Sequence, residues 1–250
     1  DIGVTLSLEL DGDAADGTNQ LDSQSIKLDF GEGGTLTFAG HGGSSAMSAV
    51  DDVVPNAYEE PWDVVTGADA GIINGHSGNN MFTYNYSHDS GVGVTVAYLN
   101  ASDAVTDVSY SDIGLTYTGI DGLTLGYAQG DVEQTTATKS DEHTMYLKYA
   151  MGPITVGVQS SEKDEDGGSS NDTESTGVGL TYQVNDDLSV GIGSHTIEYN
   201  SGDDQESTGF SASYTMGSLT IAGAYNSVDN IANTSTDDRS AYELSFGFAF

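Results

Sequence analysis

The sequence predicts an all-β fold, a transmembrane antiparallel β-barrel. Three observations lead to it: apolar and polar residues alternate with a period of two along the 250 residues, helical periodicity is nearly absent, and short turns alternate with long polar links. No segment approaches the ~20 consecutive apolar residues of a membrane helix. A barrel strand needs only every second residue to face lipid, so this observation does not exclude a membrane protein.

The charge balance excludes some classes of partner. The chain has 39 acidic and 5 basic residues, and its formal net charge is -34. A nucleic acid would be repelled by this charge, whereas cations, basic partners or a high-salt medium fit it. The chain contains no cysteine, which rules out disulfides and thiolate metal sites.

Individual strands are predicted from the alternation, which is clearest in the last segment. There Tyr242, Leu244, Phe246, Phe248 and Phe250 are large and apolar, and the residues between them are small or polar. In chain order, the other segments with such an apolar face start at Ile2, Ile26, Leu36, Phe82, Val92, Ile113, Leu123, Met145, Ile154, Val178, Leu188, Phe210 and Leu219. The sequence therefore predicts about fourteen strands, each near the length that a tilted membrane strand requires.

The alternation changes parity at two places. These lie between Tyr110 and Ile113 and between Ile192 and Ile197. An extra residue in one strand shifts the parity of all that follow, so we expect a bulge or a local exit from the sheet at each place.

The connections between the predicted strands separate into two kinds. Tight turns are expected at residues 31–34, 88–91, 119–122, 151–153, 185–187 and 216–218, and the longer polar links lie between them. Up-and-down barrels have short turns at one rim and long loops at the other. A soluble acidic β-sandwich adapted to high salt is the alternative, but it has no reason to collect its long loops at one end.

Residues 240–250, with alternating aromatics that end in Phe250, resemble the outer-membrane targeting signal of general porins from alphaproteobacteria, the Rhodobacter-type family. The resemblance implies a bacterial outer-membrane location and assembly through the barrel-assembly machinery, with Tyr242, Leu244, Phe246, Phe248 and Phe250 as the signal. It also implies contact with outer-membrane lipid, a homotrimer, and passive diffusion of small hydrophilic solutes through a water-filled channel.

The longest link, residues 40–79, supports the same resemblance. Porins of this family have one long loop that folds into the pore after the fifth of sixteen strands, and here the long loop follows the third predicted strand. We therefore expect that residues 1–250 form a single barrel domain that lacks its first hairpin, which would bring about fourteen strands to sixteen. A genuine fourteen-strand barrel is the competing interpretation.

The long loop carries the candidate pore residues. Its carboxylates Asp51, Asp52, Glu59, Glu60 and Asp63 would line the constriction and favour cations. Pro55 and Pro61 would stiffen the loop and Trp62 would anchor it to the wall. The alternative is an external acidic loop.

Basic residues are expected to face the acidic loop from the wall. Related porins place a basic cluster there, but in this sequence only Lys27, Lys148 and Arg239 are available. The sequence therefore predicts a weak transverse field and a cation-selective channel.

No catalytic or cofactor motif is present in the sequence, so we expect a channel and not an enzyme. The one metal candidate is Ca²⁺ at Asp164, Glu165 and Asp166, where carboxylates cluster without EF-hand spacing. The alternative function is a plugged or adhesive structural barrel with acidic surface loops.

Overall fold

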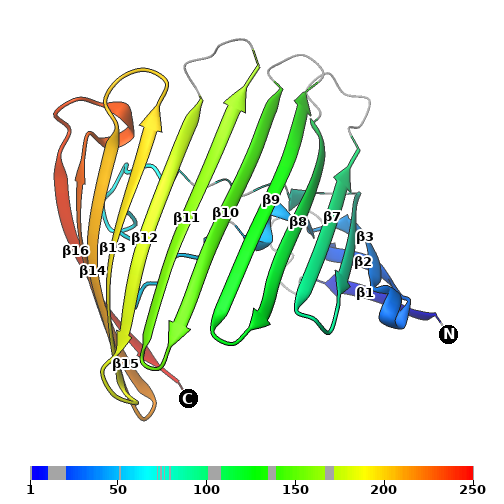
Figure 1. Cartoon of the computed structure of the whole chain (residues 1–250), viewed down its shortest axis with the longest axis horizontal. Coiled ribbons are helices and arrows are strands. Elements are labelled where there is room, and N and C mark those ends of the chain that lie inside the picture. The colour runs from blue at the N-terminus through cyan, green and yellow to red at the C-terminus, as the bar shows by residue number, and fades with distance from the viewer. Residues whose placement is uncertain are drawn as a thin grey trace.

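The computed structural model describes residues 2–10, 21–50, 52–71, 73, 75, 77–78, 80–100, 108–134, 139–166 and 172–249. Fourteen strands form one curved sheet, drawn in Figure 1. These strands are β1 (Gly3–Leu10), β2 (Leu21–Asp29), β3 (Thr35–His41), β6 (Met81–Ser87), β7 (Val92–Leu99), β8 (Val108–Ile120), β9 (Leu123–Gln134), β10 (Ser140–Met151), β11 (Ile154–Glu165), β12 (Thr173–Gln183), β13 (Leu188–Tyr199), β14 (Gln205–Met216), β15 (Leu219–Asp229) and β16 (Arg239–Phe248).

Each strand of this sheet pairs antiparallel with its neighbours in the chain, so the topology is a simple meander. The predicted all-β antiparallel fold with about fourteen strands is confirmed. Within the described residues β1 pairs only with β2 and β16 only with β15, so the sheet is open between these two edges. The additional N-terminal hairpin stays a prediction.

The two faces of the sheet differ as the alternation predicts. Large apolar side chains lie on the outer face and are exposed, for example Leu6 (65%), Ile192 (57%) and Phe246 (57%). In a membrane this face meets hydrocarbon, so its exposure in the isolated chain is the expected condition of a barrel strand. The opposite face carries mainly glycine, serine, threonine and charged residues and surrounds an interior that we call the lumen.

The connections also follow the prediction. The short turns gather at the lower end of the sheet in Figure 1, and the longer connections from β13 to β14 and from β15 to β16 lie at the upper end. Gly122, Gly152 and Gly217 lie in three of the short turns with φ of 73°, 58° and 63°. Hairpin turns of two residues need this left-handed conformation, which glycine adopts without strain.

The two predicted bulges are absent, and this expectation was wrong. Tyr110 to Ile113 pair in unbroken register with β7 and β9, and Ile192 to Ile197 pair in unbroken register with β12 and β14. Tyr110 and Ile197 are instead apolar residues on the inner face, 1% and 0% exposed. The parity changes because the inner face is covered at these positions, not because the strand shifts.

The chain between β3 and β6 provides this cover. It starts and ends at a two-stranded neck, β4 (Gly43–Ser44) with β5 (Ser77–Gly78), and contains the 3₁₀ helix η2 (Met47–Ala49). Two further 3₁₀ helices, η1 (Gly31–Gly33) and η3 (Ile231–Asn233), lie in connections. Within the described segments no helix has the length and apolar character needed to cross a membrane.

Candidate functional site: the loop inside the lumen

The described residues of segment 45–73, which we call the inner loop, lie against the inner face of the sheet. Two glutamines of the wall, Gln159 on β11 and Gln205 on β14, bind the loop backbone through both the nitrogen and the oxygen of their side-chain amides. Gln159 Nε2 donates to the Val50 carbonyl (3.0 Å), and the Val53 N–H donates to Gln159 Oε1 (3.2 Å). Gln205 Nε2 donates to the Asp69 carbonyl (2.7 Å), and the Asp69 N–H donates to Gln205 Oε1 (2.9 Å). We call these two contacts the glutamine bridges.

A row of glycines makes room for the loop between the bridges. Gly157, Gly179, Gly193 and Gly209 are directly opposite one another on β11, β12, β13 and β14. A Cβ atom at Gly157 or Gly179 would lie 2.5 or 2.4 Å from Pro55, and one at Gly193 or Gly209 would lie 2.8 or 2.7 Å from Pro61. Real Cβ atoms do not approach other heavy atoms this closely. The row therefore forms a groove that only a side-chain-free wall can provide.

Apolar contacts fix the loop at two places. Met47, Val50 and Ile73, near its two ends, pack with Ala128 of β9 and with Tyr146 of β10. Val65, further along the loop, packs with Val228 and Ile231.

In the middle of the loop, Trp62 is 6% exposed and its ring lies 4.3 Å from the imidazole of His195 between centroids. The expectation that Trp62 anchors the loop to the wall is confirmed. Burial of this kind is the main stabilising contribution of an aromatic anchor.

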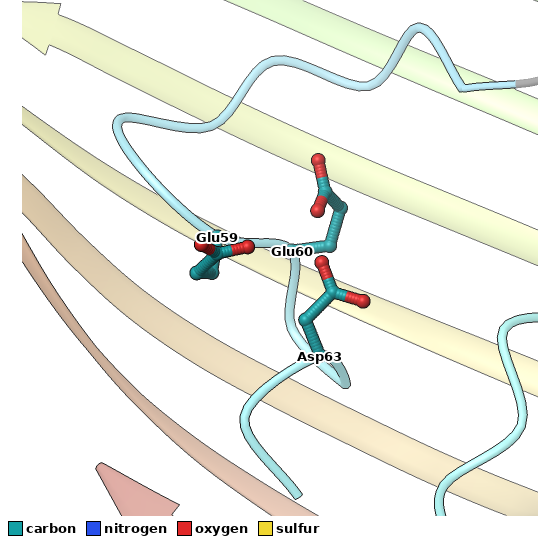
Figure 2. Close-up of side chains that lie close together, drawn as sticks. All are labelled: Glu59, Glu60 and Asp63. Atoms are coloured by element: carbon teal, nitrogen blue, oxygen red, sulfur yellow. The ribbon is translucent and has the colours of Figure 1, made fainter. Parts of the chain in front are cut away.

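Three carboxylates project from one bend of the loop. One oxygen each of Glu59, Glu60 and Asp63 can be chosen so that all three atoms lie within 4.8 Å of one another. Figure 2 shows these side chains on the same bend, with the strands of the wall behind them. Oxygen ligands at such spacing are of the kind that a hard divalent cation takes.

The surroundings of these carboxylates change their protonation. Burial raises the pKa of Glu60 from its ordinary value of 4.5 to about 9, with further contributions from its hydrogen bond with Asp63 and from the charge of Asp52. Burial, together with the charge of Asp63, also raises the pKa of Glu59. Like charges confined in a partly desolvated site oppose full ionisation, which favours the neutral form of Glu60.

The bend is connected to the wall on its other side. The Asn226 side chain of β15 donates to the Glu60 carbonyl, and the Asn56 side chain donates to the Glu60 carboxylate. The Tyr58 hydroxyl donates to Glu243 of β16 (2.5 Å), and the Ala57 N–H donates to Ser211 of β14 (3.0 Å). The bend that carries the carboxylates is therefore held by side chains of β14, β15 and β16.

The structure brings together only some of the predicted pore residues. Lys148 lines a cavity of 490 Å³ together with Asp52 and Glu60 of the loop. Lys27 lies on β2 opposite Thr37 and makes no described contact with the loop. Asp51 lies outside the described residues. Arg239 bonds the loop backbone at the Thr66 carbonyl (3.1 Å) and forms an ion pair with Asp237.

The other predicted residues lie away from the loop. Tyr242, Leu244, Phe246 and Phe248 point outward from β16 and are 57–83% exposed, and Phe250 lies outside the described residues. Asp164 and Glu165 are consecutive strand residues, so their side chains leave opposite faces of β11. Glu165 forms an ion pair with Lys163 (2.6 Å). The structure does not gather Asp164, Glu165 and Asp166 into one group, and calcium binding there stays a prediction.

Sequence reasoning missed the wall residues that hold the loop. Gln159, Gln205, Ser211 and Asn226 are 0–7% exposed, although each lies on the polar face of its strand. The available signal was the pair of parity changes at Tyr110 and Ile197 together with the repeated glycines at inward positions of β11 to β14. Apolar residues and glycines on an otherwise polar face of a sheet both indicate that another segment of the chain covers that face.

Comparisons with known proteins agree with this architecture. The family model for Gram-negative porins matches residues 134–250. The refined structure of a porin superposes with a TM-score of 0.71 at 13% identity, covering 100% of this chain and 92% of that chain. The fold is that of a porin.

Two further structures show the same likeness. The anion-selective porin from Comamonas acidovorans has a TM-score of 0.69 at 19% identity, covering 100% of this chain and 84% of that chain. OmpT of Vibrio cholerae, an outer-membrane protein in its trimer form, has a TM-score of 0.64 at 14% identity, covering 92% and 81%. No curated protein matches the chain by sequence.

The porin fold and the family match together locate the protein in the bacterial outer membrane. The outward apolar face of the sheet provides the lipid-facing surface that this location requires. The similarity to Gram-negative porins in general is supported, whereas the narrower likeness to alphaproteobacterial porins stays a prediction.

Proposed function

We propose that the protein is a porin channel for passive diffusion of small hydrophilic solutes and that it favours cations. The observation that carries this proposal is the inner loop, which occupies the lumen and presents Glu59, Glu60 and Asp63 on one bend. Charged side chains that line a constriction set the sign of the ions that pass. The proposal includes no catalytic step and no cofactor.

The sign of the selectivity depends on the side chains and not on the fold. The Comamonas acidovorans porin has a similar fold and is anion-selective. This chain has only 5 basic residues against 39 acidic ones, and Lys148 is the basic residue that lines the cavity beside the acidic bend. A negative potential in the lumen raises the local concentration of cations and lowers that of anions.

The reversal potential across a planar bilayer under a KCl gradient tests the proposal. We expect stepwise, ohmic current with a reversal potential on the cation-selective side. In the double variant Glu59→Gln, Asp63→Asn the reversal potential should move toward zero. A matched variant outside the lumen, Glu174→Gln on the exposed face of β12, should leave it unchanged. Anion-selective current would refute the cation preference, and no current would favour a plugged or adhesive barrel.

The assembly of the protein is part of the same proposal. We infer a homotrimer embedded in outer-membrane lipid, because OmpT of Vibrio cholerae, which has a similar fold, exists in a trimer form. The C-terminal strand, with its outward row of aromatic residues, is the proposed recognition element for the barrel-assembly machinery. Mass measurement of the detergent-solubilised protein by light scattering tests the oligomeric state, and a monomeric mass would contradict it.

A further inference from the structure

A second cavity lies on the inner face of β2, β3, β6 and β7, away from the strands that hold the acidic bend. Its volume is 400 Å³, which is within the range of pockets that bind small organic molecules. Gly43 and Ser44 of the neck and Ser45 at the start of the inner loop close it on one side. The cavity therefore lies between the wall and the segment that enters the lumen.

The lining of this cavity differs in charge from the rest of the chain. The wall contributes four hydroxyls and one amide, those of Ser25, Thr37, Thr83, Thr95 and Asn85. Among the described residues the lining includes no lysine, arginine or carboxylate, and Lys27, opposite Thr37 on β2, does not line it. By contrast, the cavity beside Lys148 includes Asp52 and Glu60. In a chain with 39 acidic residues, this is a neutral polar surface.

The polar groups of the wall lie on a regular grid. Thr37 on β3 is directly opposite Thr83 on β6, and Asn85 on β6 is directly opposite Thr95 on β7. Directly opposite residues of a sheet are about 5 Å apart, and alternate residues of one strand are about 7 Å apart. A grid of this size matches one sugar ring with its hydroxyl groups.

Some of these groups are fixed by hydrogen bonds and others are free to bind a solute. The Thr83 hydroxyl donates to the Ser44 carbonyl (3.1 Å), which connects the wall to the neck, and the Thr95 hydroxyl donates to Asn85 Oδ1 (2.9 Å). Within the part of the chain that the structure describes, Asn85 Nδ2 and the Thr37 hydroxyl have no hydrogen-bond partner. The Thr83 and Thr95 hydroxyls can still accept, so the cavity offers both donors and acceptors.

We propose that this cavity is a binding subsite for neutral polyhydroxylated solutes of the size of a monosaccharide. Each sugar hydroxyl can both donate and accept, which matches the mixed groups of Thr37, Thr83 and Asn85. A carboxylate or ammonium solute would lose part of its hydration here and find no opposite charge in the lining. Ala39 and Ala49 provide small apolar surfaces for the C–H groups of the ring. The wall beneath the neck therefore selects neutral solutes by their hydroxyl groups.

This inference rests on the proposed channel function, and one recording tests the two separately. The potassium current through the purified protein in a planar bilayer is measured while D-glucose is added. We expect the current to fall along a saturating curve with half-saturation at about 10 mM, an affinity that a few neutral hydrogen bonds in water allow. Tetraethylene glycol dimethyl ether, a solute of similar size without hydroxyl groups, should lower the current only in proportion to its concentration.

The double variant Thr37→Val, Asn85→Leu removes the two free groups. It should raise the half-saturating glucose concentration about tenfold, because each lost neutral hydrogen bond weakens binding severalfold. Thr155→Val is the matched control, since it removes an inward hydroxyl that lines the other cavity, and it should leave glucose binding unchanged. An unchanged potassium current of each variant before glucose is added shows that the barrel is intact.

The outcomes separate the subsite from the channel. A linear response to glucose in the wild-type channel overturns the polyol subsite and leaves the channel in place. So does a saturating response that the double variant keeps, or one that Thr155→Val weakens equally. Absence of potassium current through the wild-type protein overturns the channel itself.

Discussion

The glutamine bridge at Gln159 gives a quantitative prediction about the stability of the constriction. The variant Gln159→Leu keeps the size of the side chain but leaves the Val50 carbonyl and the Val53 N–H without their partners. Val50 is 1% exposed, so its carbonyl has little access to water. Thr144 keeps its hydrogen bond to Ser161 (2.7 Å), so the wall itself loses little.

The magnitude follows from the cost of leaving buried polar groups unsatisfied. At about 1–2 kcal/mol for each of the two backbone groups, the variant weakens loop docking by about 2–4 kcal/mol. Since about 1.4 kcal/mol corresponds to a factor of ten, the population of undocked loop rises by a factor of about 30 or more. Undocking moves the carboxylate bend away from the wall and widens the passage.

Single-channel recording measures this population directly. We expect Gln159→Leu to show frequent excursions to a higher conductance level that are rare in the wild-type channel. Gln129→Leu is the control, because Gln129 is exposed on β9 and bonds only Tyr127 among the described contacts. If Gln159→Leu records the same conductance and the same open-channel noise as the control, the glutamine bridge does not hold the loop and the reasoning fails.

Three further predictions follow from the loop and the sheet. Gly179→Ala places a Cβ against Pro55 and should change the conductance and cost about 1–3 kcal/mol. Gly247→Ala should do neither, because a Cβ there would lie at an ordinary contact distance of 3.9 Å from the Thr220 Cβ, and equal unfolding midpoints of the two variants would contradict the groove. Cation preference should rise as pH increases from 7 to 10, because Glu60 ionises through its raised pKa of about 9; the reversal potential of Glu60→Gln should lack this step. Phe248→Ser should lower the yield of folded protein in outer-membrane fractions, and an unchanged yield would exclude this residue from the assembly signal.

The fold was predictable because its cause is local. Alternating apolar and polar residues identify each strand, and glycine and polar residues identify the turns. Strands and turns could therefore be predicted without knowledge of distant contacts. The placement of Tyr110 and Ile197 was not predictable in the same way. Their apolar character on the inner face has meaning only once the loop is known to cover them, and the same residues in an uncovered strand would indicate a shift of register.

The candidate site was predictable in its residue types but not in its arrangement. The acidic loop and Lys148 could be named because a charged loop and an inward lysine are visible in the sequence. The raised pKa of Glu60 depends on its burial and on Asp63 and Asp52, which the sequence does not reveal. Gln159 and Gln205 hydrogen-bond to backbone groups of the loop. Every residue has such groups, so the sequence of side chains does not show which ones a glutamine will bind.

The glycine row has a consequence for the order in which the channel is built. The wall groove that accepts Pro55 and Pro61 is formed by four strands that follow the loop by about a hundred residues or more, and the Ala57 bond to Ser211 spans 154 residues. Contacts of such separation form late, because the intervening chain must be ordered first. The loop therefore precedes its own binding groove during synthesis and insertion, and the narrowing of the passage is completed only when β11 to β14 stand side by side.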